Sequence, residues 1–179
     1  MWTVNKRYLN DAMFGQPLPK VNTVPKTPAD EMILQDSDQN YRVMNLVGSP
    51  FNENNTSYHH KSIGGYHAAK LRRYQEMIEE HISGEMSALF SGVSEAEGDL
   101  EKLNPLEFPV LNMLNTRYFI FPLQGGQTVP LENPFALGNA WFVNEVQYVA
   151  NANEEIEAIH GLDPSQKAVV DKKFQSVVK

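Results

Sequence analysis

Residues 108–121 read FPVLNMLNTRYFIF and contain the sharpest change of pattern in the chain. Residues 108–114 are predicted to form a short helix. Residues 117–121 are predicted to form a buried strand, because aromatic and β-branched side chains make a continuous apolar run there. A second strand is predicted at residues 41–47, where a mostly apolar run ends at Gly48-Ser49-Pro50.

Two helices are predicted on the N-terminal side of this stretch. Thr27-Pro28-Ala29-Asp30 is a helix start, and Asp36-Ser37-Asp38 is expected to end that helix. The second helix is predicted from about residue 66 to residue 82, because its apolar residues recur at helical spacing. Residues 83–104 are acidic and contain glycines, and we expect a surface excursion with at most a short helix.

The C-terminal part of the chain is predicted to hold the longest strand, at residues 140–149, after a turn at Gly125-Gly126. Asn153 is expected to cap a short acidic helix that Gly161 ends, and residues 163–166 give a second capping signal. The whole pattern indicates the α+β class: one domain at residues 27–179 with a small mixed sheet flanked by helices, after an extended lead-in at residues 1–26.

Composition limits the functions that this chain can have. It has 179 residues, a net charge of −7 and no cysteine. The acidic balance argues against binding to nucleic acid, which needs a basic surface. The absence of cysteine excludes disulfides, thiolate metal sites and cysteine nucleophiles. No stretch approaches the ~20 apolar residues of a membrane-spanning helix, and taken alone the sequence favours a soluble protein.

One basic island stands out in this acidic chain, and it is the predicted binding site. Between His59 and Arg73 there is no carboxylate, and a Gly-Gly pair precedes the predicted helix. Backbone N–H groups at such a turn can face an anion such as a phosphate or an acidic sugar. The predicted site residues are His59, His60, Lys61, Ser62, Gly64, Gly65, Tyr66, His67, Lys70 and Arg73.

The same residues have plainer interpretations. The glycines can simply make a turn, and the basic side chains can pair with the glutamates that follow. The histidines do not have the spacing that is usual for metal ligands. Asp36-Ser37-Asp38 fits a turn better than a site for a metal-bound nucleotide sugar. The sequence contains no serine-hydrolase motif. No cofactor, metal or catalytic residue is therefore predicted. Four aromatic side chains are candidates for stacking on sugars, with a core position as the alternative: Tyr58, Tyr66, Tyr74 and Trp141.

Four segments, in this order, resemble the soluble region of the YfhO family of polytopic bacterial membrane proteins, in its Bacteroides-group form. They are residues 41–46 (YRVMNL), 56–66 (TSYHHKSIGGY), 111–120 (LNMLNTRYFI) and 132–143, from Glu132-Asn133 through ALGNAWFV.

The resemblance implies a parent protein with many membrane helices, similar to glycosyltransferases that use polyprenyl-phosphate sugars at the outer face of the membrane. It places this chain on the periplasmic face of the inner membrane, attached to the membrane-embedded half that carries the family's catalytic acid.

Three functional hypotheses follow. The first is a non-catalytic domain that positions a lipid-linked sugar or an acceptor glycan in cell-envelope glycan synthesis. The second is a structural spacer or protein-docking domain with no ligand site. The third is a small independent hydrolase or transferase, which would need a pocket with a catalytic group of shifted pKa.

Overall fold

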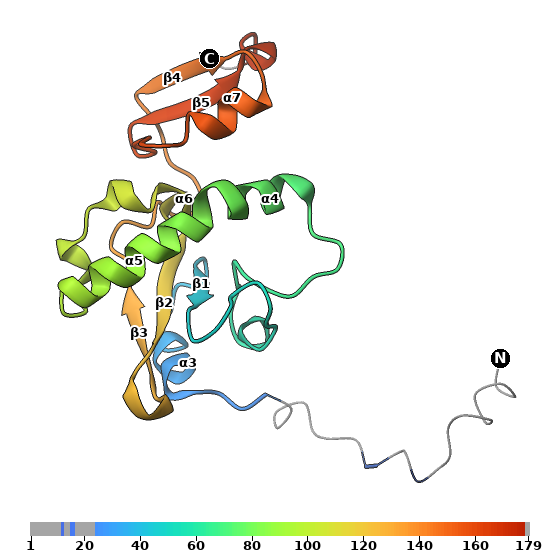
Figure 1. The fold of residues 1–179 in the computed structure, drawn as a ribbon, viewed down its shortest axis with the longest axis vertical. Coiled ribbons are helices and arrows are strands. Elements are labelled where there is room, and N and C mark those ends of the chain that lie inside the picture. The colour runs from blue at the N-terminus through green and yellow to red at the C-terminus, as the bar shows by residue number, and fades with distance from the viewer. Residues whose placement is uncertain (1–11, 13–14, 17–23, 178–179) are drawn as a thin grey trace, which may run out of the picture.

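The computed structural model describes residues 12, 15–16 and 24–177. The predicted lead-in at residues 1–26 therefore lies mostly outside the described residues. Helices and strands are interleaved as the α+β class requires, which confirms the predicted class (Figure 1). In chain order they are α3 (Pro28–Ile33), β1 (Arg42–Asn45), α4 (Arg72–Met77), α5 (Ser83–Glu95), α6 (Pro109–Met113), β2 (Thr116–Pro122), β3 (Thr128–Glu132), β4 (Glu145–Val149), α7 (Ala152–Glu157) and β5 (Lys167–Asp171).

A three-stranded mixed sheet lies at the centre of the fold, in the order β1-β2-β3. β1 pairs with β2 in parallel, and β2 pairs with β3 as an antiparallel hairpin through the predicted turn at Gly125 and Gly126, both of which have φ near +77°. Because side chains alternate along a strand, β2 contributes to both faces. Phe119 and Phe121 enter the main core, whereas Ile120 packs beneath α3.

The helix α3 begins as the sequence predicts. Thr27 and Asp30 form a reciprocal capping box, and Pro28 stands in the first turn. Ala29 and Ile33 are fully buried against β1 and β2. Helix α3 covers one face of the sheet. The other face is covered by the long helix, which runs from Arg72 to Glu95 through α4 and α5.

The prediction for residues 66–104 was wrong in two respects. The helix begins only at Arg72, because Leu71 is still extended. It then continues past Ile82, through the π-helical turn Ile78–Ile82, into α5, where an excursion was expected. Burial of Leu89 explains the continuation, since tertiary packing overrides the low helix propensity of the serines and glycines in this segment. Gly92 packs closely there, since a Cβ would lie 2.9 Å from the Leu103 Cδ2 atom.

Residues 145–171 form a small unit in which β4 and β5 are joined by α7 and pair in parallel. The predicted strand at 140–149 covers only Glu145–Val149. Asn151, and not Asn153, caps α7. The predicted capping signal at residues 163–166 starts no helix. Asp163 instead accepts the Ser165 N–H in a turn that leads into β5.

The small unit lies on the opposite side of the long helix from the main sheet (Figure 1). His81 of the helix contacts this unit: its ring N–H donates to the Ile156 carbonyl at 2.8 Å, and its ring lies against that of His160 at a tilt of 44°, with 4.4 Å between the ring centres. Ile159 also packs against the main core. Burial lowers the pKa of His81, so the neutral imidazole is favoured at this contact. Within the described residues, no helix is long and apolar enough to cross a membrane.

Candidate functional site

The predicted basic loop is held mainly by bonds to its own protein. His60 is buried, and its Nε2 lies 3.0 Å from the Asp30 carboxylate at the start of α3. Burial opposes ionisation of Asp30, but hydrogen bonds from His60 and Thr27 outweigh it and hold the pKa of Asp30 at about 2. His59 donates to the Val24 carbonyl, and Lys61 donates to the Gln39 carbonyl at 2.8 Å. These side chains therefore fasten the loop to the segments around α3.

Packing requires the first glycine of the loop, and backbone conformation requires the second. A Cβ on Gly64 would lie 2.1 Å from the Pro50 carbonyl oxygen, and Gly65 has a φ of +119° and donates its N–H to the same oxygen. The Ser62 hydroxyl accepts the Gly64 N–H. Since the helix starts at Arg72, the glycine pair does not lead into a helix N-terminus. The expected geometry of an anion site is thus absent from this described loop.

The remaining predicted residues point to different places. Tyr66 is 65% exposed, and the His67 ring accepts the Ala69 N–H. Lys70 lies over the Phe51 ring, 5.2 Å from its centre. Only Arg73 reaches a large cavity. The structure therefore does not bring the ten predicted residues together as one site.

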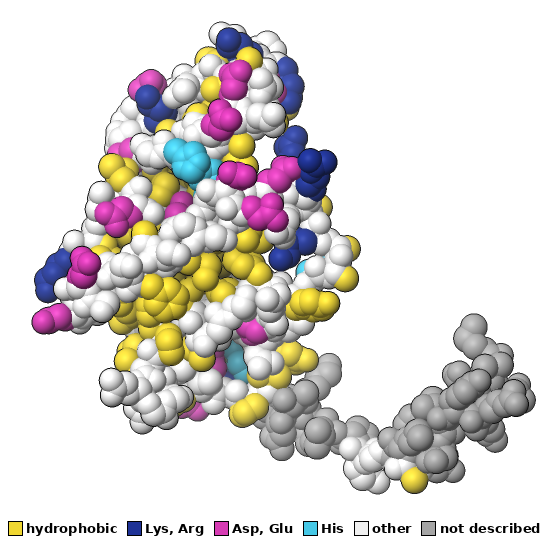
Figure 2. All heavy atoms as spheres, viewed as in Figure 1, with side chains coloured by type: hydrophobic (Ala, Val, Ile, Leu, Met, Phe, Trp, Pro, Cys, Tyr) yellow, Lys and Arg dark blue, Asp and Glu magenta, His cyan; other side chains and the backbone are white. Residues whose placement is uncertain are grey.

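The structure also places the residues that were considered for nucleotide-sugar binding, metal binding and sugar stacking. Asp36 accepts a hydrogen bond from the Tyr118 hydroxyl at 2.8 Å and lies 3.5 Å from the Arg117 guanidinium. Both contacts hold parts of the fold together, which fits the structural interpretation. The described residues contain no group of three or more His, Asp or Glu side chains suited to a metal ion. Tyr74 donates its hydroxyl to the Ile63 carbonyl and packs against the core. Acidic side chains are scattered over the visible face of the molecule, as its net charge suggests (Figure 2).

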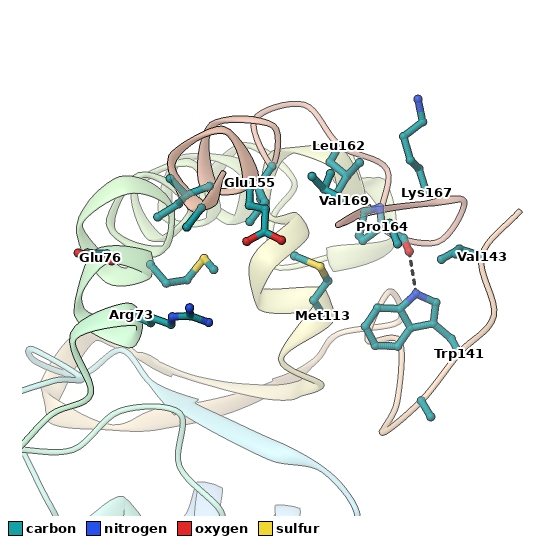
Figure 3. Close-up of a pocket in the computed structure, with 16 residues that line it drawn as sticks. Arg73, Glu76, Met113, Trp141, Val143, Glu155, Leu162, Pro164, Lys167 and Val169 are labelled. Atoms are coloured by element: carbon teal, nitrogen blue, oxygen red, sulfur yellow. Dashed lines mark hydrogen bonds between the residues drawn. The ribbon is translucent and has the colours of Figure 1, made fainter. Parts of the chain in front are cut away.

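A cavity of about 590 Å³ between the long helix and the small unit is the strongest candidate site. Its volume lies within the range of pockets that hold small molecules. Helix α4, helix α6, the connecting segment 140–143 and the small unit all contribute to its walls (Figure 3). The walls are mainly apolar and consist of Met77, Met113, Ala140, Trp141, Val143, Ala152, Ile156, Ile159, Leu162, Pro164, Ala168 and Val169.

Four charged side chains line the cavity, and three of them are engaged elsewhere. Glu76 pairs with Arg72 at 2.8 Å, and Lys167 pairs with Glu145 at 3.0 Å. Glu155 accepts the Asp171 N–H at 2.6 Å.

Arg73 is the fourth charged side chain. It has no ion pair or side-chain hydrogen bond among the described residues, and its guanidinium points toward the space that the apolar side chains enclose (Figure 3). An apolar cavity with one uncommitted cation suits an amphiphile with an anionic end.

Trp141 fixes the wall that the connecting segment provides. Its indole N–H donates to the Pro164 carbonyl at 2.7 Å, so the segment is tied to the turn before β5 (Figure 3). The next residue, Phe142, is fully exposed. Sequence reasoning assigned Trp141 to sugar stacking or to the core and missed the cavity. The run of Ala140, Trp141 and Val143 was predicted as the start of a strand, and no feature of the sequence marks it as a cavity wall.

Two of the segments that carry the resemblance, residues 111–120 and 132–143, are joined by buried hydrogen bonds. The buried Asn133 amide donates to the Asn112 side chain and to the Thr116 carbonyl, both at 2.9 Å. Asn115, at a left-handed φ of 56°, donates to the Asn40 carbonyl. No protein-family model, curated protein or solved structure matches this chain.

Proposed function

We propose that this chain is a non-catalytic binding domain of a larger membrane protein of the YfhO type, and that it positions a lipid-linked glycan in cell-envelope glycan synthesis. The observation that supports the proposal is the apolar cavity with the uncommitted Arg73 at its edge. A polyprenyl-phosphate sugar has the matching chemistry, because an apolar chain is joined to a phosphate.

The two ends of such a ligand would be recognised differently. The methionines Met77 and Met113 are flexible side chains that adapt to an irregular apolar chain. The Arg73 guanidinium can form a bidentate hydrogen bond with a phosphate, which a lysine cannot do. The periplasmic location and the membrane-embedded partner half come from the resemblance, and they belong to the same proposal.

A structural spacer or protein-docking domain is the second candidate, and the basic loop favours it. His60 and Lys61 are occupied by Asp30 and by the Gln39 carbonyl, so the loop offers few free groups to a ligand. If the cavity binds nothing, this second function is the better description of the chain.

Titration calorimetry of the whole chain with farnesyl phosphate tests the proposed ligand class. We expect saturable binding, and weaker binding of farnesol, which has the same chain without the phosphate. Arg73→Ala should weaken the binding of farnesyl phosphate by at least roughly tenfold, because each charge-assisted hydrogen bond of the bidentate pair contributes about 1.5 kcal/mol.

Lys70→Ala is the matched control. This nearby cation lies over the Phe51 ring and does not line the cavity. Equal losses in the two variants would contradict a specific role of Arg73, and no saturable binding by the unmodified chain would contradict the ligand class.

An immunoblot of fractionated cells, with antibody raised against this chain, tests the membrane parent. The proposal expects a membrane-bound band several times heavier than 20.2 kDa. A soluble band near that mass would remove the membrane parent and leave a free-standing binding protein.

A further inference from the structure

A second pocket of about 420 Å³, called the polar pocket below, is lined mainly by polar side chains. The segment before β1, the first residues of β2 and the residues from the end of β3 to position 139 form its walls. It shares no lining residue with the apolar cavity. Its polar side chains include those of Asp38, Asn40, Asn115, Arg117, Glu132 and Asn139.

Asn115 offers a hydrogen-bond acceptor at this pocket. Its side-chain Nδ2 donates to the Asn40 carbonyl at 2.6 Å and to the Asn139 Oδ1 at 3.3 Å. Because a backbone carbonyl can only accept, the first bond identifies the remaining side-chain atom of Asn115 as the oxygen. This Oδ1 accepts no hydrogen bond from a described residue, although Asn115 is only 7% exposed. A nearly buried acceptor without a protein partner needs a donor from water or from a ligand.

The backbone holds Asn115 in place before any ligand arrives. Its φ of 56° is left-handed, a conformation that asparagine adopts more readily than most residues. Its N–H donates to the Asn112 carbonyl, and its own carbonyl accepts the Arg42 N–H. A side chain that is already fixed in this way loses little freedom when a ligand binds.

The charged groups of the polar pocket are bonded to one another and leave an excess of negative charge. The Arg117 guanidinium lies within 3.5 Å of Asp36, Asp38 and Glu132. Three carboxylates around one guanidinium disfavour an anionic ligand. A metal ion is disfavoured as well, because both oxygens of Asp38 already accept hydrogen bonds, from the Asn40 N–H and from Arg117.

The groups that remain free include donors and acceptors. The Asn139 Nδ2, the Asn40 side-chain amide and the second carboxylate oxygen of Glu132 make no hydrogen bond to a described residue. A sugar hydroxyl both donates and accepts, so a neutral sugar matches this mixture.

Two other neutral ligands fit the polar pocket less well. A peptide strand needs an open sheet edge and pockets for its side chains, whereas only Pro134 and Ala136 contribute apolar side chains to this lining. A nucleobase stacks on aromatic side chains, and none lines the pocket among the described residues.

We propose that the polar pocket binds a neutral sugar residue, with the Asn115 Oδ1 and the Asn139 amide as hydrogen-bond partners. This inference rests on the proposed function, since both assign a glycan to this chain, and it deepens that function by giving the sugar a site of its own. Asn139 is followed directly by Ala140, which lines the apolar cavity. One segment therefore borders both sites, as a ligand that joins a sugar to an apolar chain requires.

NMR titration of the whole, isotope-labelled chain with neutral methyl glycosides (of glucose, galactose, mannose and N-acetylglucosamine) tests the inference. We expect saturable shifts of the Asn115, Gly138 and Asn139 amides with at least one of them, and dissociation constants in the millimolar range. Asn139→Ala should weaken this binding roughly fivefold, as expected for one lost neutral hydrogen bond. Asn153→Ala is the matched control and should bind unchanged, because this exposed asparagine of α7 does not line the pocket.

Three results would overturn the sugar site. They are the absence of saturable shifts with all of these glycosides, shifts that saturate only at residues outside the polar pocket, and equal losses of affinity in the two variants. Glucuronic acid, which carries a carboxylate, should bind roughly threefold more weakly than methyl glucoside. Tighter binding of the acid would contradict a site for neutral sugars.

The test with farnesyl phosphate separates this inference from the proposed function. Arg73 does not line the polar pocket, so Arg73→Ala should leave glycoside binding unchanged. A chain that binds farnesyl phosphate but no glycoside keeps the proposed ligand class and loses the sugar site. A chain that binds a glycoside but no farnesyl phosphate keeps the sugar site and loses the apolar cavity as the lipid site.

Discussion

The carboxylate of Glu85 in α5 accepts the backbone N–H of Val110 in α6 at 2.9 Å, although 25 residues separate the two in sequence. Its second oxygen accepts the Leu111 N–H, also at 2.9 Å. The first turn of α6 is therefore capped by a residue of another helix, because Phe108 at its own N-cap position makes no side-chain hydrogen bond. This contact fastens the helix before β2 to the long helix.

We predict that Glu85 makes stability depend on pH. Burial raises its pKa from 4.5 to about 7, although the two N–H donors oppose the shift. A carboxyl group with a raised pKa in the folded state stabilises the fold at low pH, and this contribution is lost as the pH rises from about 4.5 to 7. The effect can reach about 3 kcal/mol. In urea titrations across this range, Glu85→Gln should flatten the dependence, and an unchanged slope would contradict the assignment.

We predict the opposite sign for Asp30. Its pKa of about 2 lies below the ordinary 3.8, so its contribution to stability is present above pH 3.8 and is lost as the pH falls toward 2. Asp30→Asn removes the carboxylate that accepts the Thr27 N–H and contacts the His60 ring, and it should cost about 2 kcal/mol at pH 7. The exposed Asp38→Asn is the control and should cost less than about 1 kcal/mol. Similar losses in both variants, measured by chemical denaturation, would show that the buried pair is unimportant.

We predict that Gly64 cannot be replaced by alanine without loss of stability. The added Cβ would overlap the Pro50 carbonyl, and the backbone there must shift. A strain of this kind costs about 1–3 kcal/mol. Gly48→Ala is the matched control, because a Cβ at Gly48 meets no atom within 4 Å. Thermal unfolding of both variants compares them directly, and an unchanged melting temperature for Gly64→Ala would contradict the packing argument.

We predict that Trp141→Phe weakens the link between the connecting segment and the turn before β5. The variant loses the N–H that binds the Pro164 carbonyl, at a cost of about 1 kcal/mol. The neighbouring Phe142→Ala should leave stability within about 0.5 kcal/mol of the unmodified chain, since this ring is fully exposed. Denaturant titrations should separate the two variants. A larger loss for Phe142→Ala would mean that the ring has a contact outside the described structure.

The parts of the fold that the sequence predicted well are those with local signals. The capping box at Thr27 and the apolar run before Pro122 need no knowledge of distant residues. The continuation of the helix beyond Ile82 depends instead on burial of Leu89 against a core that the rest of the chain supplies. Strand β3 escaped prediction because Pro130 lies in its middle, and this residue is tolerated only since it faces away from β2.

The candidate site was harder to predict than the fold. The basic residues near His60 form one group in the sequence, yet the structure directs His60 toward α3 and Arg73 toward the cavity. The cavity itself is made by four separate segments that meet only after folding. Of the ten predicted residues, only Arg73 lines it, and composition alone gave no means of separating Arg73 from Arg72.

The indole of Trp141 makes the cavity wall visible to fluorescence spectroscopy. The chain has two tryptophans, and the other, Trp2, lies outside the described residues. In a Trp2→Phe background, Trp141 is the single emitter, and it stands where the segment 140–143 meets the small unit. An apolar chain that enters the cavity would replace water beside the ring and shift its emission to shorter wavelength. The same wall that encloses the ligand would thus report its arrival without an attached dye.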